Sequence, residues 1–493
     1  VGRFQVPAGW TAQAYRFALD LTPSQQRAFR SHAGGARVAY NTMLALVKAV
    51  MDQRAAERTY GIAEEDLTPP ADWSFRGLRD EWNGLKHDAA PWWAENSKEA
   101  YNSGLYALAN GLEAWSKSGT GERAGRAIGF PRFKNAKTRR SVRFTTGALR
   151  VEPDRHHVTL PRLGQLKTHE STRKLARRVE AGTARILSVT LSEDVAGRVF
   201  GSFQVLVKRS AEVPGHVGAG EPVVGVDVGV KEGCLLVAAT PDGREVHRVP
   251  APRSLAAAQG RLRALQRRAA RQQGPWDPRT QARQQPSKRW EKTRRRVART
   301  HARAAAVRRD VLCKETTALA QRHEVITVET LNASGMRSAG GARKKGLNRA
   351  LSDAALAEIR RMLGYKCEWY GSVLVEAYRY FPSSQICSGC GGRKPSLTLD
   401  DRIYECDFCG LVIDRDLNAA INLARLGERL RTGGTGTGTG SSPAASHRAG
   451  DGRGATRETA TTPVVNAAGR ETSTRHGSTA GKTETATPQG EAA

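Results

Sequence analysis

The stretch VVGVDVGV, from Val223 to Val230, sets a single carboxylate inside a continuous apolar run. A short run rich in β-branched residues predicts a strand that is buried on both faces. An ionised carboxylate is costly there unless it is paired or binds a cation, so Asp227 is a candidate ligand for something positive. Gly225 and Gly229 would let other backbone, or a ligand, come close. The alternative is an aspartate that caps a turn at the end of the strand.

Two later segments repeat the combination of an apolar element and a carboxylate. The run VITVE, from Val325, predicts a second buried strand, which ends in Glu329. The run from Val412 to Ala424 predicts a late helix with Asp416 in its first turn, and Asp414 could be its N-cap. Each carboxylate alone is weak evidence for a site.

The order of these elements predicts an α/β domain with three carboxylates at one end of its sheet. After Asp227 the sequence indicates a three-strand meander, and helices and strands then alternate. Three anions in one place repel each other unless divalent cations offset the charge. Oxygen ligands suit Mg²⁺ or Mn²⁺, and a pair of such ions drives phosphodiester hydrolysis. Asp227, Glu329 and Asp416 are therefore candidate magnesium ligands and catalytic residues.

The charge of the chain points to a polyanionic partner. It has 493 residues with a formal net charge of +30, and nucleic acid is the usual partner of such a field. No apolar run approaches the length of a membrane span, so a membrane partner is not expected. Residues 252–322 are predicted to be helical, and between Arg261 and Arg309 there are 17 Lys/Arg against two acids. One face of this region is predicted to pack on the domain through Val297, Ala304, Val307, Val311 and Ala318.

Two basic clusters are candidate nucleic-acid contacts. Arg132 and Lys134 lie in the run FPRFK, where cations alternate with aromatic residues, and Arg294, Arg295 and Arg296 lie in the helical region. Interleaved aromatics and cations suit a surface that follows a phosphate backbone. The alternative for both clusters is a solvated, charged face.

Four of the seven cysteines form two CxxC pairs with 15 residues between them: Cys387, Cys390, Cys406 and Cys409. This is the spacing of a four-thiolate zinc site, with a small β-hairpin expected between the pairs. Four thiolates close the coordination of the ion, so the zinc should be structural. A redox pair is the alternative. The other three cysteines are scattered, which suits a reducing, cytoplasmic compartment.

The first half of the sequence contains patterns typical of strands and patterns typical of helices. Ala14–Leu21, Ser141–Thr145, Val158–Pro161, Arg185–Leu191 and Val199–Lys208 predict an antiparallel, barrel-like β segment. Helices beginning at Thr22-Pro23 are expected to be inserted after its first strand. Residues 211–220 predict a linker, and residues 432–493, rich in Gly, Thr, Ser and Ala, predict a disordered tail.

Several of these motifs resemble a known group. GVDVGVK from Gly225, VETLNASGM from Val328, the cysteine pairs and DRDLNAAIN from Asp414 look like the RuvC-like nuclease of TnpB proteins and the compact type V CRISPR effectors. Ser383-Ser384-Gln385, the FPRFK run, and Tyr15-Arg16-Phe17 followed by Thr22-Pro23 and Gln25 are also similar to that group. The resemblance covers about residues 10–430.

The resemblance implies an α/β multidomain fold. It comprises a wedge-type β-barrel (1–22 and 126–215), a helical recognition insert (23–125), an RNase H-like RuvC nuclease domain (221–382 and 412–431) and a zinc-binding, nucleic-acid-binding insert (383–411). It also implies a guide RNA, and single- and double-stranded target DNA cleaved next to a short flanking motif by Asp227, Glu329 and Asp416 with Mg²⁺ or Mn²⁺. The expected setting is the prokaryotic cytoplasm, on nucleoid DNA.

Two other functions stay open on the sequence. One is a guide-dependent DNA-binding protein that silences its target with little or no cleavage. The other is a transposon-associated nuclease that needs no guide. Intact acids at all three positions disfavour the silencing protein, and copurifying RNA would separate the two guide-dependent functions from the guide-free nuclease.

Overall fold

The structure is a computed structural model, and its described part lies within one compact unit, Val1–Ala449. It describes residues 5–136, 138–209, 221–230, 233–283, 286–333, 335–338, 344–398 and 401–432. The second unit, Gly450–Ala493, lies outside the described residues. So do the predicted linker at 211–220 and, after Thr432, the predicted tail.

The N-terminal half is built on an antiparallel sheet of seven strands in the order β2-β6-β7-β1-β5-β4-β3. The strands are β1 (Trp10–Asp20), β2 (Ser141–Phe144), β3 (Arg150–Val151), β4 (His157–Leu160), β5 (Gly164–Thr168), β6 (Ala184–Glu193) and β7 (Val199–Lys208). Alternate residues of β1, Tyr15, Phe17 and Leu19, are buried in its core. In the described residues the end strands β2 and β3 do not pair with each other, so a closed barrel stays a prediction.

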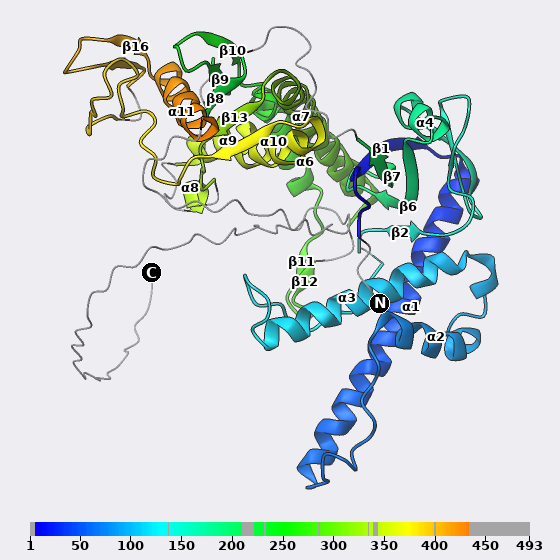
Figure 1. The fold of residues 1–493 in the computed structure, drawn as a ribbon. Helices are drawn as coiled ribbons and strands as arrows, with labels where there is room; N and C mark the ends of the chain where they lie inside the picture. Colours follow the sequence, from blue (N-terminus) through cyan, green and yellow to red (C-terminus); the bar gives the residue numbers. More distant parts are fainter. Residues whose placement is uncertain are drawn as a thin grey trace, which may run out of the picture. The chain divides into compact units, whose positions relative to one another are not determined.

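Three α-helices are inserted between β1 and β2, as the sequence predicts (Figure 1). They are α1 (Pro23–Thr59), α2 (Phe75–Ala89) and α3 (Lys98–Gly119), with a 3₁₀ turn at Trp93–Glu95. Thr22 caps α1 in a reciprocal capping box with Gln25. Trp82 and Tyr101 stack in the shared core, with ring centroids 5.3 Å apart. Trp82 is therefore a core residue here.

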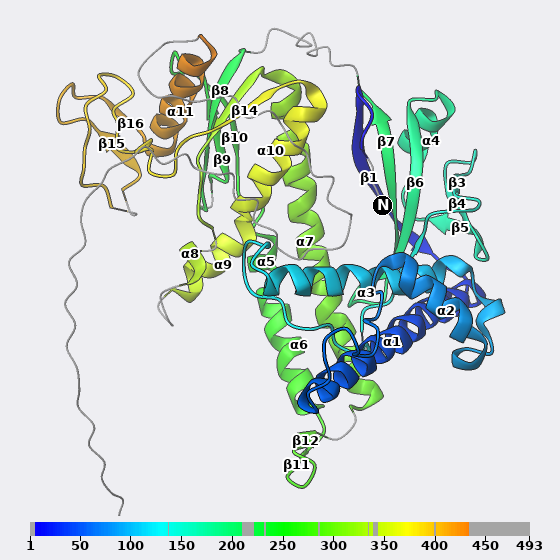
Figure 2. The same cartoon turned by 60° about the horizontal axis from the view of Figure 1, so that its bottom comes forward.

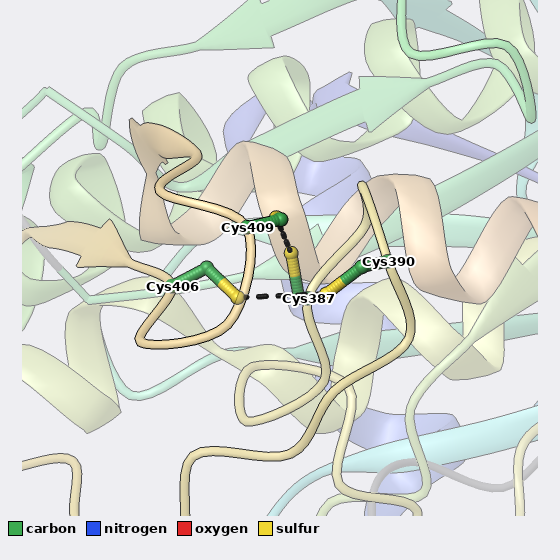
Figure 3. Close-up of side chains that lie close together, drawn as sticks. All are labelled: Cys387, Cys390, Cys406 and Cys409. Atoms are coloured by element: carbon green, nitrogen blue, oxygen red, sulfur yellow. Dashed lines mark hydrogen bonds between the residues drawn. The ribbon is translucent and has the colours of Figure 1, made fainter.

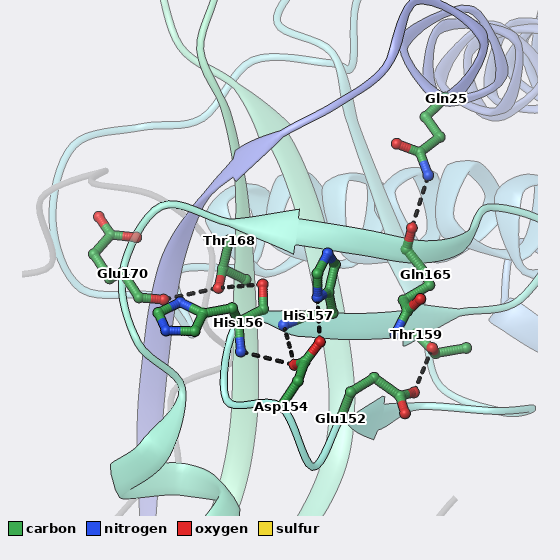
Figure 4. Close-up of polar contacts among 9 residues, drawn as sticks. All are labelled: Gln25, Glu152, Asp154, His156, His157, Thr159, Gln165, Thr168 and Glu170. Carbon is green, nitrogen blue, oxygen red and sulfur yellow. Dashed lines mark hydrogen bonds and ion pairs between the residues drawn. The ribbon is translucent and has the colours of Figure 1, made fainter.

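Polar contacts join this insert to the sheet (Figure 4). Gln25 Nε2 donates to the carbonyl of Gln165 on β5 over 2.7 Å. Asp154 accepts the backbone N–H groups of His156 and His157 and closes the turn between β3 and β4. The short helix α4 (Arg173–Glu180) follows β5. The elements β3, β5 and α4 were not predicted from the sequence.

The second half is built on a five-stranded sheet in the order β10-β9-β8-β13-β14. Its strands are β8 (Val223–Val228), β9 (Leu236–Ala239), β10 (Glu245–Val249), β13 (Val325–Val328) and β14 (Val373–Glu376). β8, β9 and β10 form the predicted antiparallel meander, whereas β13 runs parallel to both β8 and β14. The prediction of a meander followed by alternating helices and strands is confirmed.

Helices cover both faces of this sheet (Figure 2). The helices are α5 (Ser254–Ala257), α6 (Gln259–Arg271), α7 (Lys288–Arg322), α8 (Gly335–Ser338), α9 (Lys345–Ala354), α10 (Leu356–Tyr370) and α11 (Arg415–Arg431). Val224, Val226 and Ile326 share a core with α7 and α10, whereas Val237 and Ala239 share one with α11. Burial of β8 on both faces is therefore confirmed.

The prediction of which residues form the apolar face of α7 is partly wrong. Val307 is 45% exposed, and the buried residues of the helix are Thr293, Ala304, Leu312, Thr316, Leu319 and Ala320. These positions are 11, 8, 4, 3 and 1 residues apart, which keeps them on one side of the helix, so the buried stripe passes through Leu312 rather than Val307. The hairpin β11 (Trp276–Asp277) and β12 (Ala282–Arg283) separates α6 from α7 and follows Gly274-Pro275.

Candidate active site

Asp227 and the residue after β13 are brought to the same edge of the sheet. β8 and β13 are parallel neighbours, and Val226 pairs with Val328. Asp227 and Glu329 therefore occupy equivalent positions on adjacent strands, at their carboxyl ends. Along β8 and β13, side chains alternate between faces. Because Val226 and Val328 lie in the core with α7 and α10, the two acids belong to the face that α11 covers.

Two glycines let α11 lie directly on this face. A Cβ atom on Gly225 would stand 2.0 Å from the carbonyl oxygen of Ala420, and one on Gly427 would stand 2.1 Å from Oγ1 of Thr327. Any larger residue at either position would push the helix away from the strands. The prediction that Gly225 allows close approach of other backbone is confirmed, and the approaching backbone is that of α11.

Asp416 reaches the acids from the first turn of α11. Asp414 is the N-cap of the helix and accepts the N–H of Leu417 over 2.9 Å, as predicted. Asp416 is 8% exposed and Asp227 is 9% exposed. The buried Cys234 interacts with both, because its thiol donates to Asp416 and the charge of Asp227 also acts on it. Burial raises the pKa of Cys234, and the two carboxylates add to the rise.

Glu329 is electrostatically linked to Asp416. Burial raises the pKa of Glu329, and the negative charge of Asp416 adds to the rise. The Ser383 hydroxyl, which donates to Oε1 of Glu329, and the positive charge of Arg415 oppose it. Glu329 and Asp416 thus interact electrostatically in a largely buried site. Sequence analysis did not predict the contacts that Ser383, Cys234 and Arg415 make with these acids, because their partners are distant in the chain.

The three acids are more widely spaced than a single tight ligand cluster. Among the described residues, only the four cysteines meet a spacing of 4.8 Å between every pair of ligand atoms. A pair of ions about 3.5–4 Å apart needs a wider set of oxygens than one ion does. The three acids therefore do not form one tight ligand cluster in this structure, and a shared site for divalent cations stays a prediction.

The four cysteines gather at one point, as predicted (Figure 3). The Sγ atoms of Cys387 and Cys409 are 3.6 Å apart, and those of Cys390 and Cys406 are 3.5 Å apart. A tetrahedron of Zn–S bonds of about 2.3 Å places sulfurs about 3.8 Å apart, whereas a disulfide requires about 2.05 Å. The cluster therefore fits four-thiolate coordination and not a redox disulfide.

The backbone around the second pair favours thiolates. The N–H groups of Cys409 and Phe408 lower the pKa of Cys406 to about 6. A lowered thiol pKa favours metal binding at neutral pH. The hairpin was expected between the two pairs, but its strands β15 (Ile403–Glu405) and β16 (Val412–Asp414) flank the second pair. Below, residues 383–414 are called the cysteine ribbon.

The predicted basic contacts differ in their surroundings. Arg294, Arg295 and Arg296 are exposed on α7, and Arg294 lies over the ring of Trp290 at 4.8 Å. Arg132 is exposed, whereas Lys134 is half-buried, with its Nζ 3.6 Å from the ring centroid of Tyr40. The FPRFK run is therefore held against α1 in part by its own lysine.

A further group of arginines was missed in the sequence. Arg16 on β1 and Arg198 lie on the ring of Phe200, at 3.9 and 5.1 Å from its centroid. Partial burial lowers the pKa of Arg16, and the positive charges of Arg309 and Arg139 add to this. These residues come from β1, α7 and the segments before β2 and β7, so no local window of sequence contains them.

Comparison with known proteins identifies the family. "Putative RNA-guided DNA endonuclease Rv2885c" of Mycobacterium tuberculosis (strain ATCC 25618 / H37Rv) is 39% identical over 438 residues, which cover 87% of this chain and 89% of the relative. "Putative RNA-guided DNA endonuclease InsQ" of Escherichia coli (strain K12) is 27% identical over 85% of this chain and 93% of its own. The chain belongs to the TnpB family.

Family descriptions match three parts of the chain. Residues 357–423 match the Cas12f1-like TNB domain, residues 204–339 match a probable transposase (OrfB_IS605), and residues 11–55 match its helix-turn-helix domain. In this TnpB-family chain, residues 11–55 form β1 and most of the single helix α1. The resemblance inferred from the sequence motifs is confirmed.

Solved structures that resemble the chain include the Cas12f1–sgRNA–target DNA complex. The match has 10% sequence identity and a TM-score of 0.40, and it covers 84% of this chain and 99% of the other. In the described residues of this TnpB-family chain, no helix is long and apolar enough to span a membrane.

Proposed function

We propose that the chain is an RNA-guided DNA endonuclease. It binds a guide RNA and cleaves matched target DNA, next to a short flanking motif, in one RuvC-like site. Two observations support this proposal in a chain of the TnpB family: Asp227 and Glu329 occupy equivalent positions on adjacent parallel strands, and the charge of Asp416 acts on Glu329. The same proposal divides the chain into a wedge, a recognition insert, a nuclease domain and a zinc-binding insert, with the boundaries that the resemblance implies.

Asp227, Glu329 and Asp416 would hold Mg²⁺ or Mn²⁺, and the four cysteines would hold a structural Zn²⁺. Bound divalent cations supply an activated water and stabilisation of the leaving oxygen. The chain positions its ligands from two strands and a helix that are locked together through Gly225 and Gly427. Arg415 lowers the cost of gathering negative charge at Glu329.

Basic side chains would bind the nucleic-acid backbones. Arg294, Arg295 and Arg296 are exposed on a helix with few acids, and exposed cations contribute most of the sequence-independent affinity for phosphates. Arg16 and Arg198 flank an aromatic ring, and Arg309 adds to the same positive region. Asp194 pairs with Arg198 over 3.0 Å and offsets part of this charge, and a phosphate placed there would offset more of it. The proposed targets are the DNA of a prokaryotic cell, in its cytoplasm.

The test is a cleavage assay with the complex purified together with its RNA. Asp227→Asn keeps the size of the side chain and removes its charge, so we expect a loss of cleavage of about a thousandfold or more. Guide-dependent DNA binding should persist, because the acid does not contribute to it. Asp310→Asn is the matched control, because Asp310 is an exposed acid of the same domain that pairs with Lys314.

The possible outcomes of this assay distinguish the three functions. Guide-matched cutting that Asp227→Asn abolishes supports the endonuclease. Guide-dependent binding without cutting by the native chain would support the silencing protein. Cutting that does not depend on the copurified RNA would support the guide-free nuclease, and normal cutting by Asp227→Asn would remove Asp227 from the site.

A further inference from the structure

The segment that enters the cysteine ribbon contacts the candidate active site. Ser383 is 2% exposed, and its hydroxyl donates to Oε1 of Glu329. Glu329 lies just past the end of β13, so no regular strand pairing fixes its side chain. A buried hydroxyl bond to one carboxylate oxygen restricts the rotation of the acid and leaves the second oxygen for another ligand.

Helix α11 holds the same segment by its backbone. Asn422 is buried and donates from Nδ2 to the carbonyls of Ser383, over 2.8 Å, and Ile386, over 2.7 Å. Asn418 is also buried; it donates to the carbonyl of Ile386 over 2.7 Å and accepts the N–H of Ser388 over 2.8 Å. Two side-chain amides one helical turn apart thus hydrogen-bond to the first residues of the cysteine ribbon.

These bonds form a chain of contacts that links two of the acids. The chain of contacts runs from Glu329 to Ser383, from the Ser383 carbonyl to Asn422, and along α11 from Asn422 to Asp416. Glu329 and Asp416 come from different elements and repel each other, so their separation depends on such a brace. Asp227 is held separately, by the docking of α11 on Gly225.

Resting on the proposed function, we propose that Ser383 is a positioning residue that aims Glu329 at the shared metal site, and that Asn422 holds Ser383 in place for this role. The bonds around a ligand orient it, and removing one of them lowers metal affinity by about 10–100-fold. The amide and hydroxyl themselves need not touch the metal or the DNA. The cysteine ribbon then contributes to cleavage through the geometry of its first residue.

The test compares metal dependence among variants of the full chain purified with its RNA. Ser383→Ala should raise the Mg²⁺ concentration that gives half-maximal cleavage by about tenfold or more, with partial recovery at saturating Mg²⁺. A titration with Mn²⁺, followed by electron paramagnetic resonance, should show the same shift in metal affinity and does not depend on cleavage. In this titration Asp227→Asn gives the background signal of Mn²⁺ that is bound to the RNA. Asn422→Ala should move both readouts in the same direction.

Ser372→Ala is the matched control, because the Ser372 hydroxyl also donates within the domain, to the carbonyl of Ala320 over 2.7 Å. It should leave both metal readouts unchanged. Zinc content and guide binding should be unchanged in Ser383→Ala; their loss would contradict the proposal by making the hydroxyl a determinant of folding. Native metal dependence in Ser383→Ala would also overturn it. A native complex that fails to cut matched DNA would refute the endonuclease, whereas the Mn²⁺ titration would still decide the role of Ser383.

Discussion

The cysteine cluster and the acid cluster are assembled in opposite ways. The cysteines lie on two turns within one short segment, and their sulfurs already stand 3.5–3.6 Å apart in two pairs. The acids come from β8, from the end of β13 and from α11, and they are more widely spaced. The first site is determined by local spacing and backbone N–H groups. The second depends on sheet order and on the packing of a helix against two glycines.

The comparison predicts that a change far from any ligand atom can destroy the acid cluster but not the cysteine cluster. Gly225→Ala places a methyl group where the backbone of Ala420 lies, so α11 must move off the sheet. We expect a loss of stability of about 1–3 kcal/mol or more, and a loss of cleavage that added Mg²⁺ does not recover. Thermal unfolding and cleavage assays measure the two effects.

Gly346→Ala is a control for Gly225→Ala, because a Cβ atom there meets no other atom within 4 Å. Zinc content of Gly225→Ala should stay at the native value. A stable, active Gly225→Ala protein would show that α11 is not held by that contact.

A smaller effect is expected from breaking the cysteine cluster itself. Cys406→Ser removes the thiol whose pKa lies at about 6, so the chain should lose its zinc, as elemental analysis would show. Because the ribbon contacts α11 through Asn418 and Asn422, cleavage should fall as well, while guide binding remains. Native zinc content in this variant would contradict the assignment of the four cysteines.

The basic surface of α7 should contribute to the affinity for the guide RNA and to its dependence on salt. Replacing Arg294, Arg295 and Arg296 together by Ala removes three exposed cations. Binding of the guide RNA should weaken, and the slope of log affinity against log salt should fall by about 2. Replacing the three exposed arginines by lysine keeps the charge and serves as the control. An unchanged slope in the alanine variant would mean that this surface is only a solvated face.

The smallest effect concerns pH. Burial raises the pKa of Glu329, so the folded, metal-free chain binds this proton more tightly than the unfolded chain. Its contribution to stability is fully present below the ordinary glutamate pKa and is lost as pH rises through the raised value. Glu329→Gln keeps an acceptor for Ser383 and should therefore raise the melting temperature of the metal-free protein at neutral pH, with less gain in acid. An equal gain at both pH values would contradict this account.

Local patterns in the sequence predicted the local features well. β8, the N-cap Asp414 and the cysteine cluster were found from runs, capping chemistry and spacing. The stripe on α7 was misplaced at Val307, because periodicity alone does not fix which of two adjacent stripes faces the sheet. Ser383 and the arginines around Phe200 could not be predicted, because their partners are distant in sequence and meet only in the fold.

The central claim is that Asp227, Glu329 and Asp416 share divalent cations at one sheet edge. Anomalous scattering from crystals of the full chain soaked in Mn²⁺ would locate the ions directly. The account predicts Mn²⁺ bound jointly by carboxylate oxygens of these three residues at the carboxyl ends of β8 and β13. Ordered Mn²⁺ bound elsewhere, with these carboxylates still apart, would contradict it.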